Sequence, residues 1–134
     1  MLLLPYPIST NRYWRNFRGR MVRSSAAIEY KDLVTALATE SLMAMHLVPV
    51  SVRMVLHPER PADWEKRSRK DPMWALKVRR IDIDNAQKVA LDALQGVVFE
   101  NDRQVTSLSI ELGDPIPGGG LSVTIEPDKK WSTQ

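Results

Sequence analysis

The sequence predicts an α+β protein in which a mixed β-sheet has two main helices packed on it. Apolar residues recur near the helical period in two stretches, whereas four other stretches have the short or alternating apolar patterns of strands. The chain has 134 residues, of which 43% are hydrophobic and 26% charged, a balance typical of globular proteins. We expect residues 1–134 to form one domain with the order strand, helix, strand, loop, helix, strand, strand.

The first third of the chain predicts a strand, a loop and a helix. Leu2–Leu4 form a short strand, which the two following prolines end. Residues 9–23 are polar and basic, and we expect a long loop there. Ser24 or Ser25 can cap a helix that runs to about Met45, because apolar residues recur near the helical period.

The middle of the chain predicts a strand followed by an extended basic segment. Residues 48–57 alternate apolar with polar or small side chains up to a proline, which predicts a half-buried strand. Residues 58–80 contain three prolines and many charged side chains. Within them, Trp74–Val78 are expected either to add a short strand or to belong to a mobile loop.

A second helix is predicted from about Asn85 to Leu94. Asp84 is its expected N-cap, and Gln87 at the third helical position fits a capping box. Gly96 is expected to end the helix.

The last third of the chain predicts two strands, Arg103–Glu111 and Leu121–Glu126. A connection rich in proline and glycine joins them, so we expect a hairpin. The tail from Pro127 is expected to fray.

The composition excludes several classes of protein. The chain has no cysteine, which excludes a disulfide scaffold, a thiolate zinc site, an iron–sulfur cluster and a cysteine nucleophile. No apolar run approaches the length of about 18 residues that a membrane span needs, and the apolar start is too short for a signal peptide. We therefore expect a cytoplasmic protein with no membrane partner.

The net charge of +3 is unevenly distributed. Residues 1–80 contain 15 Lys and Arg against 7 Asp and Glu, whereas residues 81–134 contain 4 against 9. A basic half beside an acidic half suggests an anion-binding surface next to a site that needs carboxylates. Uneven surface charge without a function is the alternative.

Asp82 and Asp84 are the strongest candidates for a chemical site. In an extended segment their side chains leave by the same face, and two carboxylates about 4 Å apart repel by roughly 4 kcal/mol at an effective dielectric near 20. Such a pair shares a proton, stays apart in water or holds a cation, and oxygen ligands favour Mg²⁺ or Mn²⁺. Lys88, one helical turn further on, is suited to hold a phosphate oxygen. Asp102 is the candidate third ligand, because we expect the chain to return there toward the second helix.

The alternative is that these residues have only structural roles. Asp84 would then be an N-cap, Asp82 a solvated side chain and Lys88 part of an exposed helix face. Asp92 is expected either to support Lys88 or to face water.

Four segments match a pattern in order. Leu4–Arg15 resemble P-x-P-P-S-x-N-R-Y-x-R, and Asp82–Lys88 follow D-x-D-N-x-x-K. Asp92–Leu94 read D-A-L, and Asn101–Val105 follow D-D-x-Q-V with Asn101 in place of the first acid. Over most of its length the chain therefore resembles the RusA-type Holliday junction resolvases, a family of crossover junction endodeoxyribonucleases.

The resemblance implies a RusA-like homodimer that nicks four-way DNA junctions symmetrically in DNA recombination and repair. It also implies Mg²⁺ dependence, with Mn²⁺ as a substitute, and a bacterial or phage-infected cell. The essential aspartates of the family fall on Asp82, Asp84 and Asp102, which would hold the metal, and its active-site lysine falls on Lys88. Residues 58–78 are longer than the family pattern leads us to expect.

Phosphate contacts are expected from polar and basic side chains in two regions, namely Asn11, Arg12, Arg15, Arg18, Arg20, Arg79 and Arg80. For each arginine the alternative is a solvated loop residue. Tyr13, Trp14 and Phe17 are candidates to stack on unpaired bases, or else they anchor the loop to the domain. Trp64 and Trp74 are likewise candidates to wedge between bases of the junction.

The sequence therefore predicts a Mg²⁺-dependent endonuclease specific for branched DNA. Two alternatives remain: a non-catalytic branched-DNA-binding protein of the same fold, and a Mg²⁺-dependent phosphoesterase acting on a small substrate. The long basic stretches argue against the latter, since a small phosphate needs only one or two cations.

Overall fold

The computed structural model describes residues 1–131 and contains a four-stranded sheet and a separate two-stranded hairpin. The sheet has the order β1 (Leu2–Leu4), β6 (Gly120–Pro127), β4 (Val50–His57) and β5 (Val105–Leu112). β4 runs parallel to β5 and antiparallel to β6, which also pairs antiparallel with β1. The predicted α+β class with a mixed sheet is confirmed.

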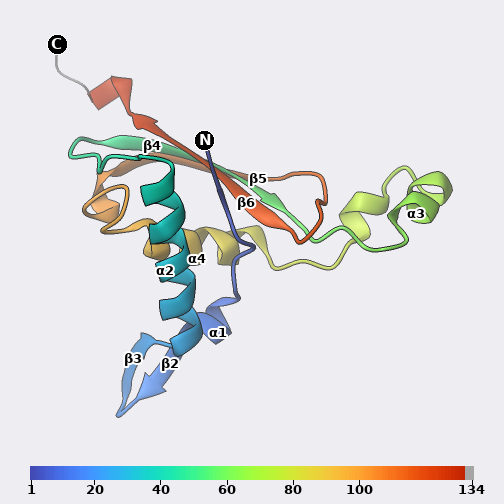
Figure 1. The fold of residues 1–134 in the computed structure, drawn as a ribbon, viewed down its shortest axis with the longest axis horizontal. Helices are drawn as coiled ribbons and strands as arrows, with labels where there is room; N and C mark the ends of the chain where they lie inside the picture. Colours follow the sequence, from blue (N-terminus) through green and yellow to red (C-terminus); the bar gives the residue numbers. More distant parts are fainter. Residues whose placement is uncertain (132–134) are drawn as a thin grey trace.

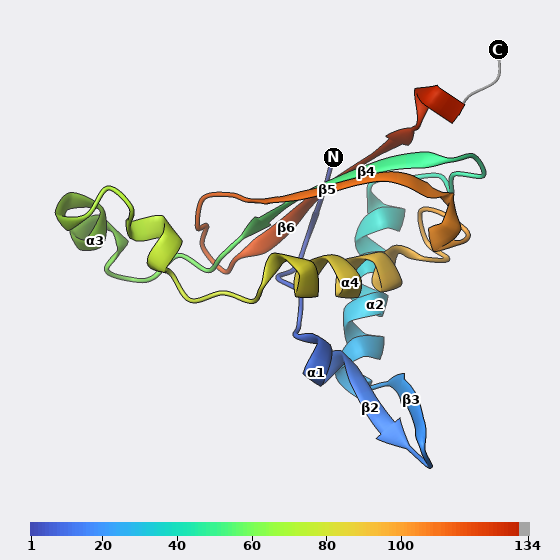
Figure 2. The ribbon, with the colours of Figure 1, turned by 180° about the vertical axis from the view of Figure 1, so that it is seen from behind.

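Two helices, α2 (Ser25–Glu40) and α4 (Ile83–Leu94), lie on one side of this sheet (Figure 1). The view from behind shows the same arrangement (Figure 2). α4 buries small side chains, which let it approach its neighbours closely: Ala86, Ala90 and Ala93, together with Val89 and Leu94. None of the helices within residues 1–131 has the length and apolar content that a membrane crossing requires.

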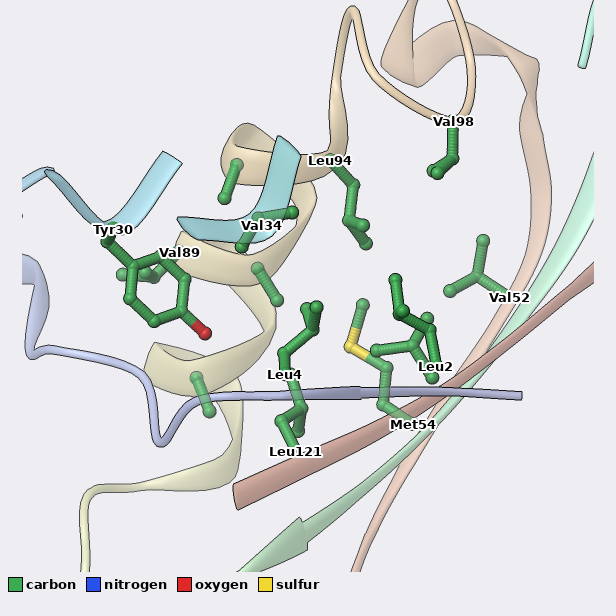
Figure 3. Packing of buried hydrophobic residues seen from close by; sticks show 14 of the residues in the cluster. Leu2, Leu4, Tyr30, Val34, Val52, Met54, Val89, Leu94, Val98 and Leu121 are labelled. Atoms are coloured by element: carbon green, nitrogen blue, oxygen red, sulfur yellow. The ribbon is translucent and has the colours of Figure 1, made fainter. Parts of the chain in front are cut away.

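The hydrophobic core fills the space between the sheet and the two helices. Figure 3 shows Leu4 of β1, Met54 of β4 and Leu121 of β6 beside Val34 of α2 and Leu94 of α4, and all five are fully buried. Every second residue of β4 points into this core. The alternating pattern of the sequence therefore predicted the buried face of β4 correctly.

The long loop predicted before α2 is wrong. A short helix, α1 (Thr10–Tyr13), leads directly into a hairpin of β2 (Trp14–Phe17) and β3 (Arg20–Arg23). Arg18 and Gly19 at its tip both have positive φ angles, 53° and 77°, the turn geometry that matches the twist of two paired strands. The hairpin projects from the rest of the molecule in both views (Figures 1 and 2).

The predicted start of α2 is confirmed and its predicted end is wrong. Ser24 is the N-cap, and its hydroxyl accepts a hydrogen bond of 3.1 Å from the backbone N–H of Ala27. The helix ends at Glu40 instead of near Met45. Leu42 adopts a left-handed conformation with φ 56°, which takes the chain out of the helical path.

Residues 58–80, called the arm below, contain a helix, α3 (Trp64–Lys70), and a 3₁₀ turn, η1 (Trp74–Lys77). The short strand that was one expectation for Trp74–Val78 is wrong, because residues 74–77 form this 3₁₀ turn. The indole rings of Trp64 and Trp74 pack against each other with 6.2 Å between ring centroids. The arm extends away from the sheet and the other helices (Figures 1 and 2).

The predicted hairpin between the last two strands is also wrong, because β4 lies between β5 and β6 and pairs with both. Residues 113–119 are long enough to carry the chain past the edge of β4. After β6, a 3₁₀ helix spans Lys129–Trp131, so the tail does not fray immediately after Pro127. The remaining residues, 132–134, lie outside the described part of the chain.

Candidate functional site

The segment that carries Asp82 and Asp84 forms the start of α4. Asp82 is the N-cap, and its backbone carbonyl accepts a hydrogen bond of 3.0 Å from the N–H of Ala86. The predicted cap at Asp84 is therefore wrong, and so is the capping box with Gln87, because no side chain caps this helix. Asp84 lies in the first helical turn, so the two aspartates do not share an extended segment.

The side chains of Asp82, Asp84 and Lys88 are exposed. None of them has a salt bridge or a side-chain hydrogen bond to any residue in the described part of the chain, residues 1–131. Asp84 and Lys88 are four residues apart and are neighbours on the helix surface. The positive end of the helix dipole favours negative charge at this terminus. These groups are therefore available to bind a cation or a phosphate from outside the chain.

Asp102 lies at the other end of α4. Its backbone N–H donates a hydrogen bond of 3.2 Å to the side chain of Gln95, the C-cap of this helix. The 12 residues of α4 span about 18 Å at roughly 1.5 Å per residue. Within residues 1–131, no three acidic or histidine side chains are grouped so that they could hold a metal ion. The expectation that a single chain brings Asp102 to Asp82 and Asp84 is therefore wrong, since the chain returns to the opposite terminus of the helix.

Two hydrogen bonds fasten the N-terminal segment on either side of the two aspartates. The backbone N–H of Ile81 donates to the hydroxyl of Tyr6 at 2.8 Å. The backbone N–H of Thr10 donates to the side-chain oxygen of Asn85 at 2.7 Å. Helix α1 is thereby held beside the start of α4.

The residues predicted to contact DNA are all exposed, and they are Asn11, Arg12, Arg15, Arg18, Arg20, Arg79 and Arg80. The first five lie on α1 and the hairpin, and the last two end the arm immediately before Ile81. The fold thus places basic side chains on both polypeptide segments that meet at the start of α4. Their contacts with DNA stay a prediction.

The three aromatic residues near the hairpin have different roles. Tyr13 is fully buried, and Trp14 packs edge-on against it with 5.1 Å between ring centroids. These two anchor the hairpin. Phe17 is 46% exposed near the tip, with the guanidinium groups of Arg15 and Arg18 each 5.1 Å from its ring centre. Of the three, Phe17 is the most exposed, and its stacking on a base stays a prediction.

Asp92 connects the hairpin to α4. Its carboxylate accepts hydrogen bonds from the side chain of Arg23, at 2.6 and 2.7 Å, and from the hydroxyl of Tyr13. The expectation that Asp92 supports Lys88 or faces water is therefore wrong. Burial opposes the charged carboxylate, but the hydrogen bonds from Arg23 and Tyr13 outweigh it and hold the pKa of Asp92 below its usual value. Burial, reinforced by Asp92, raises the pKa of Tyr13.

Lys31 of α2 satisfies the C-terminal end of α4. Its ammonium group donates to the backbone carbonyls of Asp92, Ala93 and Gln95, at 3.0, 3.3 and 2.6 Å. These carbonyls have no partner within the helix. Burial lowers the pKa of Lys31.

Sequence reasoning gave no role to Tyr6 or Asn85, although both lie in the segments that carry the family resemblance. Asn85 directly follows the second aspartate, and a short polar side chain at a helix start commonly bonds to backbone groups. That signal was present in the sequence. The identity of its partner, Thr10, was not, because the two residues are 75 positions apart.

Exposed paired carboxylates, a neighbouring lysine and two basic projections are typical of proteins that act on the phosphodiester backbone of nucleic acids. A family model described as endodeoxyribonuclease RusA matches residues 5–126. The crossover junction endodeoxyribonuclease RusA of Shigella sonnei (strain Ss046) is 34% identical over 127 residues, which cover 92% of this chain and 91% of that protein.

Proteins of the same name from Escherichia coli (strain K12) and Enterobacteria phage 82 are each 33% identical over 127 residues, with the same coverage. The chain therefore belongs to the endodeoxyribonuclease RusA family. The resemblance inferred from the four segments is confirmed.

Proposed function

We propose that this chain is a homodimeric, Mg²⁺-dependent endodeoxyribonuclease that resolves four-way (Holliday) DNA junctions by paired symmetrical nicks. It acts in DNA recombination and repair, in the cytoplasm of a bacterial or phage-infected cell. One observation carries the proposal. In a chain of the RusA family, the start of α4 presents Asp82, Asp84 and Lys88 without partners among residues 1–131.

The donor set at the start of α4 fits a divalent cation that prefers oxygen ligands. Asp82 and Asp84 offer carboxylate oxygens only, which suits Mg²⁺, with Mn²⁺ as a substitute. Asp102 is the third proposed ligand. A bound ion lowers the pKa of a water molecule and neutralises negative charge on a phosphodiester.

The other residues of the site position the DNA. Lys88 extends from the same exposed helix face as Asp84, where its ammonium group is suited to hold a phosphate oxygen and to stabilise the charge that develops as the phosphodiester is attacked. Asn11 and Arg12 lie on α1, which the Thr10–Asn85 hydrogen bond holds against α4. They are suited to bind the backbone of the same strand.

A second copy of the chain completes the proposed site. Asp102 lies about one helix length from Asp82 and Asp84 in the same chain, so a single chain supplies only part of the ligand set. A dimer related by a two-fold axis supplies Asp102 of one copy to the two aspartates of the other, and it does so twice. Two equivalent sites match the two-fold symmetry of a four-way junction and account for paired nicks.

The proposal is tested with a synthetic four-way junction in the presence of Mg²⁺. Asp82→Asn and Lys88→Ala are each expected to reduce nicking by at least about 100-fold. Both variants should still bind the junction when Ca²⁺ replaces Mg²⁺. Asp32→Asn, which removes an exposed carboxylate from α2, is the control and should nick normally. If Asp82→Asn nicks as fast as the unmodified chain, the metal assignment is wrong.

The separation of the three aspartates also favours a second candidate, a non-catalytic protein that binds branched DNA. In that case the acidic residues have no role in hydrolysis. Tight binding of the junction by the unmodified chain, with no nicking in Mg²⁺ or Mn²⁺, would support this candidate.

A further inference from the structure

The arm is a folded element in which two tryptophan rings pack against each other. The guanidinium group of Arg60 lies 4.6 Å from the ring centre of Trp64, whose other neighbour is the ring of Trp74. The two tryptophans therefore hold the arm together, and both keep part of their surface exposed. Two ion pairs add to this structure, Arg67 with Asp63 at 2.9 Å and Lys77 with Asp71 at 2.5 Å.

Backbone hydrogen bonds fix both ends of the arm to the body of the protein. At its start, Arg60 donates to the carbonyl of Ile116, and Ile116 donates to the carbonyl of Pro58, each at 2.9 Å. At its end, Ile81 donates to the hydroxyl of Tyr6, and Asp82 follows directly. The base of the arm therefore has a defined position next to the start of α4.

A cavity of about 630 Å³ lies at the base of the arm. Four arginines and one acidic residue line it, namely Arg60, Arg67, Arg79, Arg80 and Glu59. A second cavity of about 220 Å³ continues along the arm and is lined by Arg67, Lys70, Asp71, Trp74 and Lys77. Arg67 lines both cavities, so the two share a basic side chain. Planar guanidinium groups bind phosphate oxygens through paired hydrogen bonds.

The charges that line these cavities are only partly neutralised. Arg67 and Lys77 have carboxylate partners within the arm. Arg60, Arg79 and Arg80 have no salt bridge to any residue from 1 to 131. A concave surface with this excess of positive charge concentrates anions near it.

We propose that the arginine-lined cavity is a second DNA-binding site, which holds backbone phosphates of a junction arm away from the bond that is cut. The identity of the ligand rests on the proposed function, because the ligand is the four-way junction itself. Residues 79–81 join the cavity to Asp82, so a strand that lies across the start of α4 continues toward the arm. In this second site Arg60 and Arg67 contact DNA, although they lie more than ten residues before the two aspartates in sequence.

The test compares two double variants of equal charge. Arg60→Gln with Arg67→Gln removes two cations from the cavity, whereas Lys66→Gln with Arg69→Gln removes two from the same arm that line neither cavity. Junction binding is measured with Ca²⁺ in place of Mg²⁺ over a range of salt concentrations. The first variant is expected to bind at least about tenfold more weakly, and its slope of log affinity against log salt should fall by about 2. The second should lose less than about threefold. Equal losses in the two variants, or no loss in the first, would overturn the proposal.

A gain in affinity separates the site from simple misfolding. Asp63→Asn removes the carboxylate that competes with phosphate for Arg67, and the Asp63 side chain makes no capping hydrogen bond to α3. It is expected to strengthen junction binding more than Glu65→Gln, which removes a charge from the same arm without freeing an arginine. An equal or smaller gain would contradict the proposal.

Two further measurements separate a free phosphate ion from DNA as the ligand, and separate failure of this site from failure of the proposed function. Calorimetric titration with inorganic phosphate tests a free anion as the ligand. Phosphate binding that depends on Arg60 and Arg67, together with unchanged DNA binding, would overturn the DNA site. Because binding is measured without hydrolysis, a chain that binds through the cavity but never nicks would refute only the proposed function.

Discussion

Asp92 illustrates how a single side chain can join three elements. It lies on α4, and its two partners, Tyr13 and Arg23, lie at the end of α1 and the end of β3. The sequence placed Asp92 correctly on a helix but offered no means to choose its partners, which are 79 and 69 residues away. A carboxylate in an amphipathic helix looks like a solvated residue until the chain that packs over it is known.

Replacement of Asp92 by Asn is expected to lower the free energy of unfolding by about 1–2 kcal/mol at pH 7, because a charge-assisted hydrogen-bond network is lost at a partly exposed position. The pKa of Asp92 is lower in the folded chain than in the unfolded one. The stabilisation is therefore complete above the unfolded pKa of about 3.9 and disappears as the pH falls from there through the folded pKa.

Thermal and urea unfolding between pH 7 and pH 2 measures this difference. The gap between the unmodified chain and the Asp92→Asn variant should shrink below about pH 4. Asp32→Asn is the matched control, and it should change stability by less than about 0.5 kcal/mol. A gap that stays constant to pH 2 would contradict the role given to Asp92.

At the scale of elements, the correct predictions were those that depend on neighbours in sequence. The N-cap of α2 at Ser24 and the end of α4 at Leu94, with Gly96 (φ 80°) just beyond it, come from local chemistry. The alternation in β4 is likewise local. The β2–β3 hairpin and the end of α2 are local features that were nevertheless missed, whereas the error in the sheet arose where a distant partner decides the outcome. β6 pairs with β4 and not with β5, because β4 offers two free edges and the connection is long enough to reach the far one.

The candidate site also combines residues that are close in sequence with one distant residue, Asp102. Asp82, Asp84 and Lys88 lie within seven residues, and their spacing placed them next to the start of the second helix, although with Asp84 instead of Asp82 as the cap. The location of Asp102 depends on the path of the chain after that helix. No pattern in residues 95–102 indicates which terminus of the helix the chain approaches.

The β2–β3 hairpin carries the prediction that belongs to this scale. Phe17→Ala is expected to abolish the change in fluorescence of a 2-aminopurine base placed at the crossover of the junction, because the exposed ring is the group placed to unstack a base. The control is Met21→Ala, which removes another exposed apolar side chain of the hairpin. A fluorescence change that persists in the Phe17 variant would show that the hairpin binds the backbone only.

At the scale of the whole molecule, the uneven charge of the sequence becomes an arrangement in space. Exposed arginines gather on the hairpin and on the arm, which project from different sides of the body (Figure 1). Two of the acidic residues proposed to hold the metal, Asp82 and Asp84, lie at the start of α4, near the base of the arm. A four-way junction presents backbone in several directions, and two basic projections from each of two chains are suited to hold it.

The central claim is that two chains complete one metal site. It is tested most directly by mixing a chain carrying Asp82→Asn with a chain carrying Asp102→Asn and isolating the mixed dimers through two different affinity tags. Each variant alone has no complete site. If Asp102 acts on the aspartates of the other copy, the mixed dimer contains one intact site and should nick one strand of the junction in Mg²⁺. Mixed dimers that nick no faster than either variant alone would contradict the account.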